Sequence, residues 1–557
     1  MTGSGLAAYL ALSLLTGVLP RPPVLTQDLV RHASHAVWTT QQQALASRSA
    51  GRLATAAALF EREALLYWLL AHQPSAGARS PTLLLDTAAA LTDAAGALRS
   101  LGQYRQAAVL YQEASPLWAS TRHPQTSTFA SLSGQELGTR LGVYALQPRA
   151  VTLPGGKFVP PPGKMYLGAY TELDSRVDGN HFRRFDALMH RHFAAFLEYV
   201  PWGDPFPFQF VRDCVRAGAA VQIAWEPSQG LAAVGPTPYV VGFLRSAAAA
   251  RIPIFLRFAG EMNGPWVPWH GHPRAFVAAW RRLWGLVHRF APNVALVWAP
   301  DATDRVGALA YYPGNAYVDW VGVSDYLPYA SRAGHHTVTS AGATLLAQLR
   351  WLYRAFARVK PIMIAEGGVA HASSLVTGRL DRFARRQYAE LLADIPLFDP
   401  DVRAVFFFDV NTVRHPNPGF ASDLATSDFS LTDSSAFLGA IVRLLHGQRS
   451  HFAFPVSAGD VPSASGTALV PVAVTGGSTL TATGPLLFVA RAHAYGAGPV
   501  SVRYRVGSRS QTALSAPYAA SFSLPRGTRP VRATATLRVD GRAAVRIRFR
   551  VEPARPR

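Results

Sequence analysis

Short apolar runs alternate with longer helical segments through the middle of the chain. The clearest run, Ile252 to Phe258, has the length and composition of a buried strand, and a Pro/Gly-rich loop follows it. A helix is predicted from about Pro273 to Phe290, and a second buried strand from Val294 to Trp298. Strand, loop, helix and strand in this order form the repeat unit of a parallel α/β fold.

The same unit recurs on both sides of this stretch. Further buried strands are predicted at Met165–Tyr170, Ala195–Val200, Ala220–Trp225, Asp319–Tyr326, within Lys360–Ala370 and at Val402–Val410. A (β/α)8 barrel of about 250 residues places a strand roughly every 30 residues. Residues 157–448 are therefore predicted to form an α/β domain of this kind, a (β/α)8 TIM barrel.

The segment before the barrel is different in character. Residues 25–150 are rich in Ala and Leu, with helical periodicity and little strand pattern. Leu98 to Ala114 resembles part of a tetratricopeptide repeat (TPR), in which small residues let two helices approach and aromatic residues fill the groove. One unit is fewer than the three or so that repeat stacking needs. An N-terminal all-α, TPR-like region that binds a protein partner and a plain helical bundle both stay open.

The composition changes again after residue 448. Residues 449–466 form a predicted linker, and residues 467–557 alternate apolar and polar positions. Val545 and Ile547 face one way while Arg546 and Arg548 face the other, as in a sheet with one solvated side. The segment resembles bacterial immunoglobulin-like modules, which implies a C-terminal Ig-like β-sandwich. We expect its arginines to form a solvated face rather than a ligand site.

The charge balance is strongly basic. The formal net charge is +21 and the pI is about 10.6, which ordinarily suggests nucleic acid or an acidic surface as the partner. Lys157, Lys164 and Lys360 are the only lysines, and no run of five or six basic residues occurs. We therefore predict no nucleic-acid partner, and anionic polymers of the cell envelope remain a secondary alternative.

Two smaller features bound the class of protein. The single cysteine, Cys214, excludes intramolecular disulfides and multi-cysteine metal sites, and its pattern predicts a buried thiol. Residues 1–24 contain an apolar segment, Leu6 to Leu19, that lacks a basic n-region and is short for a transmembrane helix. A secretory signal and an anchor both stay open for it.

Two glutamates stand where apolar strands end. Glu261 follows the strand that ends near Phe258, and a two-residue period puts it on one face with Arg257 and Ala259. Glu366 closes a second run, in which the same period predicts that Ile362, Ile364 and Glu366 share one face. Glu261 and Glu366 are separated by about three barrel units, so their strand ends meet at one rim. A pair of carboxyl groups, one neutral and one ionised, is what glycoside hydrolysis requires.

The residues around this pair resemble a known family. RFAGEMNGPWVPW (Arg257 to Trp269), VDWVGVSDY (Val318 to Tyr326) and PIMIAEGG (Pro361 to Gly368) are similar, in the same order, to segments of the family 26 glycoside hydrolases of β-mannanase type. The resemblance covers roughly residues 157–448 and implies a retaining (β/α)8 enzyme. It implies that Glu261 is the acid/base, that Glu366 is the nucleophile, and that Tyr326 lies beside the nucleophile.

One position departs from the family's pattern. Many members carry His immediately before the acid/base, where this chain has Gly260. Arg257 is expected to pair with Glu366 and keep it ionised.

A glycan cleft needs aromatic rings for sugar CH faces and polar groups for hydroxyls. The candidates at or beyond strand ends are Asn263, Trp266, Trp269, Trp225, Glu226, Trp298 and Tyr312. Core packing is the alternative for each aromatic residue, and a structural cap is the alternative for Glu226. His270 and His272 lack an identifiable third ligand, so no metal and no cofactor are predicted.

The function expected from these features is a retaining glycoside hydrolase that cleaves β-mannan or a related β-linked polysaccharide. The alternative is a non-catalytic glycan-binding or scaffold protein with a retired barrel, which the glycine at position 260 and the flanking modules favour. We expect a monomer that meets its polysaccharide outside the cell or in the cell envelope.

Overall fold

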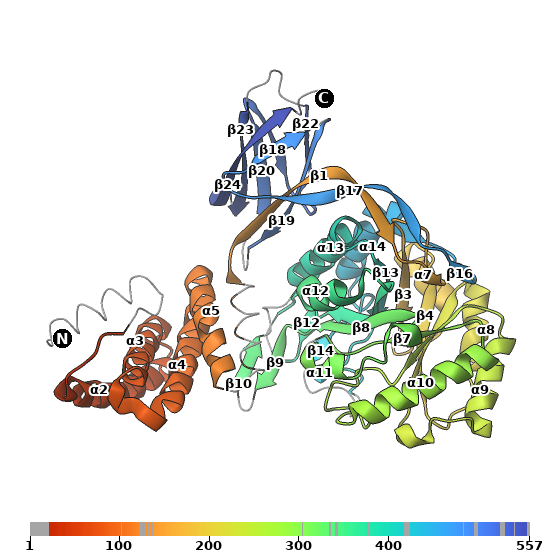
Figure 1. The fold of residues 1–557 in the computed structure, drawn as a ribbon, viewed down its shortest axis with the longest axis horizontal. Coiled ribbons are helices and arrows are strands. Elements are labelled where there is room, and N and C mark those ends of the chain that lie inside the picture. The colour runs from red at the N-terminus through yellow and green to blue at the C-terminus, as the bar shows by residue number, and fades with distance from the viewer. Residues whose placement is uncertain are drawn as a thin grey trace. The chain divides into compact units, whose positions relative to one another are not determined.

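The computed structural model describes residues 22–101, 103–121, 126, 130, 134, 137–302, 305–333, 336–339, 344–375, 378–416, 424–482, 484–494, 500–523, 530–539 and 541–553 (Figure 1). The apolar segment Leu6 to Leu19 lies outside these residues. The described chain divides into two compact units, one within residues 145–472 and the other formed by residues before 145 and after 472.

Eight parallel strands close into a barrel in the first unit. They are β3 (Met165–Tyr170), β4 (Ala195–Pro201), β5 (Ala220–Glu226), β6 (Ile254–Phe258), β7 (Val294–Trp298), β8 (Trp320–Leu327), β11 (Ile362–Val369) and β13 (Val402–Phe408). Neighbours in this order pair with each other, and β13 pairs with β3 to complete the ring. The predicted (β/α)8 barrel is confirmed.

Helices surround the ring of strands (Figure 1). They are α7 (Phe182–Met189), α8 (Phe208–Ala217), α9 (Pro238–Ala249), α10 (Pro273–Phe290), α11 (Arg305–Ala310), α12 (Leu345–Phe356), α13 (Asp381–Phe398) and α14 (Ser435–Gly447). The α10 helix shows why they form: Phe276, Trp280, Leu283 and Val287 recur at helical spacing and are buried. Cys214 is buried on α8, as predicted.

Inward-facing side chains fill the barrel. Phe255, Val297, Trp320, Met363 and Phe406 belong to one buried cluster, and each alternates with residues that face the helices. Tight interdigitation requires small residues at some inward positions: a Cβ on Gly168 would lie 2.3 Å from the ring of Phe406.

Short elements complete the barrel unit. They are β2 (Gly156–Lys157), β9 (Ala330–Ala333), β10 (His336–Thr339), β12 (Ala372–Ser373), β14 (Ser427–Asp428), β15 (Phe452–Ala453), β16 (Asp460–Val461) and the 3-10 turns Leu231–Ala233, Asn315–Tyr317, Leu424–Thr426 and Arg449–His451. The segment predicted as a linker, 449–466, thus contains two short strands and the start of a third, because its backbone pairs with β3 and β2.

The second unit begins with helices α2 (Gln27–Ser49), α3 (Leu53–Ala71), α4 (Ser80–Ser100) and α5 (Tyr104–Ser120), with a 3-10 turn at Pro74–Arg79. Alanines and a few large residues such as Phe60 and Tyr111 form their core. The prediction of helix up to residue 150 was wrong at its end, because β1 (Arg140–Leu153) is a strand. Among the described residues, no helix has both the length and the apolar content needed to cross a bilayer.

The C-terminal residues form two sheets. One has the order β17 (Ala464–Val474), β1, β19 (Leu486–His493) and β22 (Ala520–Phe522). The other has the order β18 (Thr479–Ala482), β24 (Arg542–Pro553), β23 (Val531–Val539), β20 (Val500–Val506) and β21 (Arg509–Ala513). The predicted strands are present, and β1 joins them from before the barrel. The immunoglobulin-like topology stays a prediction.

Candidate active site

Glu261 reaches the barrel mouth through a turn. We expected Arg257, Ala259 and Glu261 to share one strand face, but β6 ends at Phe258, and Ala259 and Glu261 have φ of 47° and 56°. This left-handed backbone is uncommon for residues other than glycine. Neighbouring strands hold it, because Ala259 N–H donates to Trp225 O (3.0 Å) and Glu261 N–H to Ala299 O (2.9 Å). Such strain is typical of functional turns.

Glu366 reaches the same mouth through a β-bulge. We expected Ile362, Ile364 and Glu366 to share a face, but Met363 and Ala365 belong to the barrel interior. The register against β8 shifts between Ile364 and Glu366, and Glu366 then pairs with the inward-facing Ser324. A bulge of this kind re-aims a side chain next to an active site. The irregularity brings Glu366 into phase with the lumen.

Three side chains hold the Glu366 carboxylate. Arg257 forms an ion pair with its Oε2, Tyr199 donates a hydrogen bond to Oε2, and Tyr326 donates one to Oε1. Burial alone would lower the pKa of Arg257, but Glu366 more than offsets this, so the pKa lies above its ordinary value. Burial, and secondarily the negative Glu366, raises the pKa of both tyrosines, which therefore keep their protons. The three contacts fix the orientation of the Glu366 carboxylate.

Glu261 lies in a different environment. Its Oε2 accepts a hydrogen bond from the indole nitrogen of Trp266 at 2.6 Å, and its Oε1 lies 3.9 Å from Nη2 of Arg257. Burial and the nearby Glu366 raise its pKa from 4.5 to about 7. One guanidinium group therefore approaches both carboxyl groups, and the raised pKa of Glu261 suits this residue to carry a proton near neutral pH.

The two carboxyl groups line a pocket of about 410 Å³ at the barrel mouth. Of the residues predicted from the sequence, it includes Arg257, Glu261, Glu366, Tyr326, Trp266, Trp269 and Glu226. Trp269 is buried and donates to Gly260 O at 2.8 Å, whereas Trp266 is 37% exposed. The pocket thus combines charged, hydroxyl and aromatic walls.

Three predicted aromatic residues lie elsewhere. Trp225 is fully buried and stacks on Phe243 of α9 with ring centroids 4.2 Å apart. Trp298 is also fully buried, and Tyr312 packs edge-on against it at 4.9 Å. The reason is strand alternation: Trp225 and Trp298 have the parity that faces the helices. The structure therefore supports core packing, the alternative given above, for these three aromatic residues.

Asn263 also points away from the pocket. Its amide nitrogen donates to Asp301 O at 3.0 Å, and its amide oxygen accepts from Asp301 N at 2.8 Å. Both ends of the amide therefore bind backbone, and the residue fixes the turn after Glu261 rather than presenting itself to a sugar hydroxyl.

The sequence prediction missed three polar pocket residues, Tyr170, Glu172 and Tyr199. Tyr199 has the same parity on β4 as the inward-facing Ala195 and Leu197, so alternation along this strand was a usable signal. Tyr170 donates to Oε2 of Glu172 at 2.9 Å. No motif in the sequence marked Glu172.

The glycine before Glu261 has a steric explanation. A Cβ at position 260 would lie 2.6 Å from Nε of Arg257. Because Arg257 is clamped by Glu366 and by Ser324 Oγ (3.1 Å from Nη2), it has little freedom to move. This position of the arginine requires glycine at residue 260.

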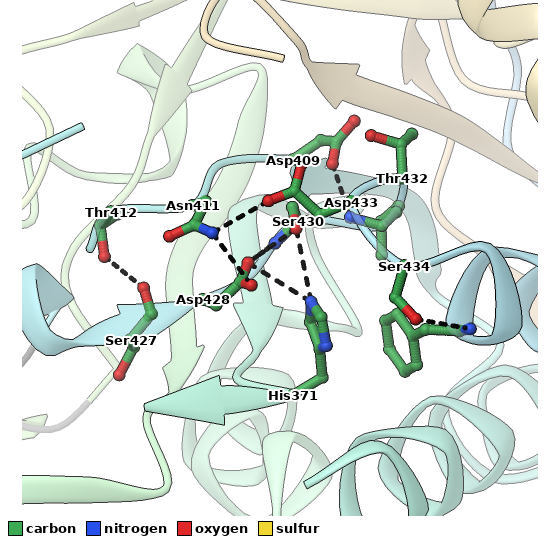
Figure 2. A network of polar contacts seen from close by, with 12 residues as sticks. His371, Asp409, Asn411, Thr412, Ser427, Asp428, Ser430, Thr432, Asp433 and Ser434 are labelled. Atoms are coloured by element: carbon green, nitrogen blue, oxygen red, sulfur yellow. Dashed lines mark hydrogen bonds and ion pairs between the residues drawn. The ribbon is translucent and has the colours of Figure 1, made fainter. Parts of the chain in front are cut away.

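A polar network lies in the loops after β11 and β13, across the barrel mouth from the loop that carries Glu261. Figure 2 shows His371, Asn411 and Ser430 converging on Asp428. His371 Nε2 lies 3.3 Å from Asp428 Oδ1, and Ser430 Oγ donates to the same oxygen at 2.6 Å. Burial alone would raise the pKa of Asp428, but hydrogen bonds, first from His371, lower it. The network fixes loops near Leu424, which lines the pocket.

The fold and the site together define a class: a (β/α)8 barrel with two carboxyl groups at the C-terminal rim of its strands. Comparison with known proteins is more specific, because residues 239–372 match the sequence model of Glycosyl hydrolase family 26. A curated relative, β-1,3-xylanase TXYA of a Vibrio species, is 34% identical over 86 residues. The match covers 14% of this chain and 17% of that protein, so the chain aligns with only a small part of the relative.

The chain is also similar to solved structures of other proteins at low sequence identity. A double mutant of the Cellulomonas fimi endo-β-1,4-mannanase is 14% identical, with 70% of this chain and 94% of that chain covered and a TM-score of 0.38. A family 39 glycoside hydrolase from Bacteroides cellulosilyticus is 12% identical, with coverages of 71% and 81% and a TM-score of 0.36. The family match, with Glu261 and Glu366 inside it, shows that the chain resembles the family 26 glycoside hydrolases.

Proposed function

We propose that the barrel is a retaining glycoside hydrolase that cleaves a β-linked polysaccharide by double displacement. One observation carries the proposal: Glu366 is clamped by Arg257, Tyr199 and Tyr326, beside Glu261 with a pKa of about 7, in one pocket. Retaining enzymes use two carboxyl groups about 5 to 5.5 Å apart, one as nucleophile and one as acid and then base.

In the first step, Glu366 attacks the anomeric carbon while Glu261 donates its proton to the leaving glycosidic oxygen. The bond from the anomeric carbon to that oxygen breaks, and a covalent glycosyl ester forms on Glu366. Two tyrosines and an arginine around Glu366 orient it, and they also stabilise it again when it leaves.

In the second step, Glu261 is ionised and takes a proton from a water molecule, which attacks the anomeric carbon of the glycosyl ester and breaks the bond from that carbon to the Glu366 oxygen. Glu366 departs as a carboxylate, and the product keeps its β configuration. The charge on Glu366 is neutralised in the ester, so the pKa of Glu261 falls at the moment when it must act as a base.

The aromatic wall supports a sugar as the ligand. Trp266 and Trp269 line the pocket on the side of Glu261, where their rings can contact the apolar CH faces of a sugar, and Glu226 and Glu172 can accept hydrogen bonds from hydroxyls. Among substrates, β-mannan and β-xylan are the leading candidates, since the similar proteins are described as a β-1,4-mannanase and a β-1,3-xylanase. Polysaccharides of this kind are large polymers, so the enzyme would act on them outside the cell.

A reducing-sugar assay on β-1,4-mannan, β-1,3-xylan, β-1,4-xylan and β-glucan tests the proposal. We expect the wild-type chain to release sugar from at least one polymer, and Glu366→Ala to abolish this. Asp213→Asn, which removes a carboxylate from the outer helix α8, is the matched control and should retain activity. Equal release by wild type and Glu366→Ala would overturn the proposal. Binding without release in both would favour a retired, glycan-binding barrel.

A further inference from the structure

The five-stranded sheet of the C-terminal region has an outward face made of arginine and hydroxyl side chains. Four arginines, Arg503, Arg505, Arg538 and Arg546, line a depression of about 450 Å³ together with serine and threonine residues. The opposite face of the same strands carries Val502, Tyr504 and Leu537 and is buried. We call this outward surface the arginine face.

The residues of the arginine face follow a regular pattern. Across strands β21, β20, β23 and β24, one row consists of Thr512, Arg503, Thr536 and Arg546. The next row repeats it with Ser510, Arg505, Thr534 and Arg548. Since neighbouring strands lie about 4.8 Å apart, arginines within a row are roughly 10 Å apart, about the length of a disaccharide.

Within the described residues, the hydrogen bonds of these guanidinium groups go to neutral oxygens. Arg503 Nη2 donates to Ser510 Oγ at 3.4 Å, Arg546 Nε to Thr536 Oγ1 at 3.2 Å, and Arg505 Nε to Gly507 O at 2.9 Å. Within the part of the chain that the structure describes, no carboxylate forms an ion pair with Arg503, Arg505, Arg538 or Arg546. Like charges gathered in this way repel one another, and an anion at the face relieves the repulsion.

The composition of the segment reinforces this pattern. Residues 473–557 contain 14 arginines and two acidic residues, Asp540 and Glu552, so they hold +12 of the net charge of +21. A general preference for arginine would scatter the charges, whereas the register places Arg503, Arg505, Arg546 and Arg548 in two rows on one face.

We propose that the arginine face binds an acidic polysaccharide, a polymer of uronic acids. A planar guanidinium matches a carboxylate in two parallel hydrogen bonds, and the interleaved hydroxyls can bind the hydroxyls of the sugar rings. No aromatic side chain stands in the two rows, so a stacking platform for nucleobases is lacking there. This inference does not depend on the activity of the barrel.

Affinity electrophoresis of the full-length chain in gels containing polygalacturonate tests the proposal. We expect wild type to be retarded, and Arg503→Gln/Arg546→Gln, which neutralises both arginines of one row, to bind at least about tenfold more weakly. The matched control is Arg509→Gln/Arg542→Gln, because these exposed arginines pair with Val506 and Val539 and so have the other parity. It should bind within about twofold of wild type. Equal melting temperatures in the three proteins exclude misfolding as the cause.

Separate gels containing a DNA duplex, polyphosphate or anionic vesicles distinguish the source of negative charge. Weaker retention by all three than by polygalacturonate supports the proposal. Tighter retention by any of them, lack of retention by polygalacturonate, or an equal loss in the control double variant would overturn it.

Discussion

Removing the Glu261 carboxylate should stabilise the barrel, and should do so only at neutral and alkaline pH. The pKa of Glu261 rises from 4.5 to about 7 on folding, first because of burial and then because of Glu366. The folded state therefore binds a proton more tightly than the unfolded chain does, and stability is lost as the pH rises from 4.5 through 7. At about 1.4 kcal/mol per pKa unit, the cost of ionised Glu261 reaches about 3 kcal/mol at pH 8.

The perturbation is Glu261→Gln, whose amide oxygen can still accept the hydrogen bond from Trp266. Its free energy of unfolding relative to wild type should rise by about 2 to 3 kcal/mol between pH 5 and pH 8. Urea unfolding followed by tryptophan fluorescence is a suitable assay, because nine of the 12 tryptophans lie between residues 202 and 351. Carboxyl groups remote from Glu261 titrate alike in both proteins, so their contributions cancel in the difference.

A second background separates the two causes. In Glu366→Gln, the same substitution at Glu261 should give a smaller gain, because the negative neighbour is gone, but burial should preserve most of it. A stability difference that does not change with pH, or that is larger at pH 5 than at pH 8, would refute the reasoning.

Four further outcomes are expected. Tyr326→Phe should lower kcat about 10- to 100-fold on any polymer that the barrel cleaves, because a hydrogen bond to a charged group contributes about 1.5–3 kcal/mol; an unchanged kcat would contradict this. Trp225→Ala should lower the free energy of unfolding in urea by about 3–5 kcal/mol, since the ring is fully buried. Trp266→Ala should instead raise KM with little loss of stability. A large loss of stability in Trp266→Ala, together with a raised KM in a stable Trp225→Ala, would contradict the placement of the two rings. Gly260→Ala should lower kcat about a hundredfold by displacing Arg257, and wild-type kinetics would show that the arginine has room to move. Uronic acid polymers should resist cleavage, because four carboxyl groups line the pocket against one arginine; efficient cleavage of polygalacturonate would contradict this.

The barrel could be predicted from the sequence because its strands are buried on both faces. Such strands appear as short apolar runs, and their spacing is set by the helix that must follow each one. The boundaries of the predicted regions were wrong where pairing with distant backbone decides the structure. The strand β1 pairs in a sheet with strands more than 300 residues away, and nothing local in Arg140–Leu153 indicates those partners.

The proposed catalytic pair was predicted for partly incorrect reasons. A two-residue period placed Glu261 and Glu366 on the lumen, but a left-handed turn and a β-bulge actually bring them there. Local conformations of this kind store strain and are imposed by neighbouring strands, so side-chain pattern alone does not reveal them. The motif was a better guide than the periodicity, because it includes the turn.

The set of aromatic and polar residues predicted to line the glycan cleft was too large. Trp225 and Glu226 are adjacent, yet one faces the helices and the other faces the pocket. Applying strand parity to every candidate would have separated them and would also have selected Tyr199. Strand parity could not predict the role of Asn263, because its side chain binds the backbone of Asp301, in the loop after the next strand.

The central claim is that Glu261 and Glu366 divide the work of one double displacement. Azide rescue tests it most directly, using an aryl β-glycoside of the sugar that the polysaccharide assay identifies. With azide present, Glu261→Ala should regain turnover and form the β-glycosyl azide, because a glycosyl ester on Glu366 still forms and azide needs no base. Glu366→Ala should instead form the α-glycosyl azide in a single displacement. Failure of both variants to respond to azide, or the two anomers appearing the other way round, would contradict the assignment.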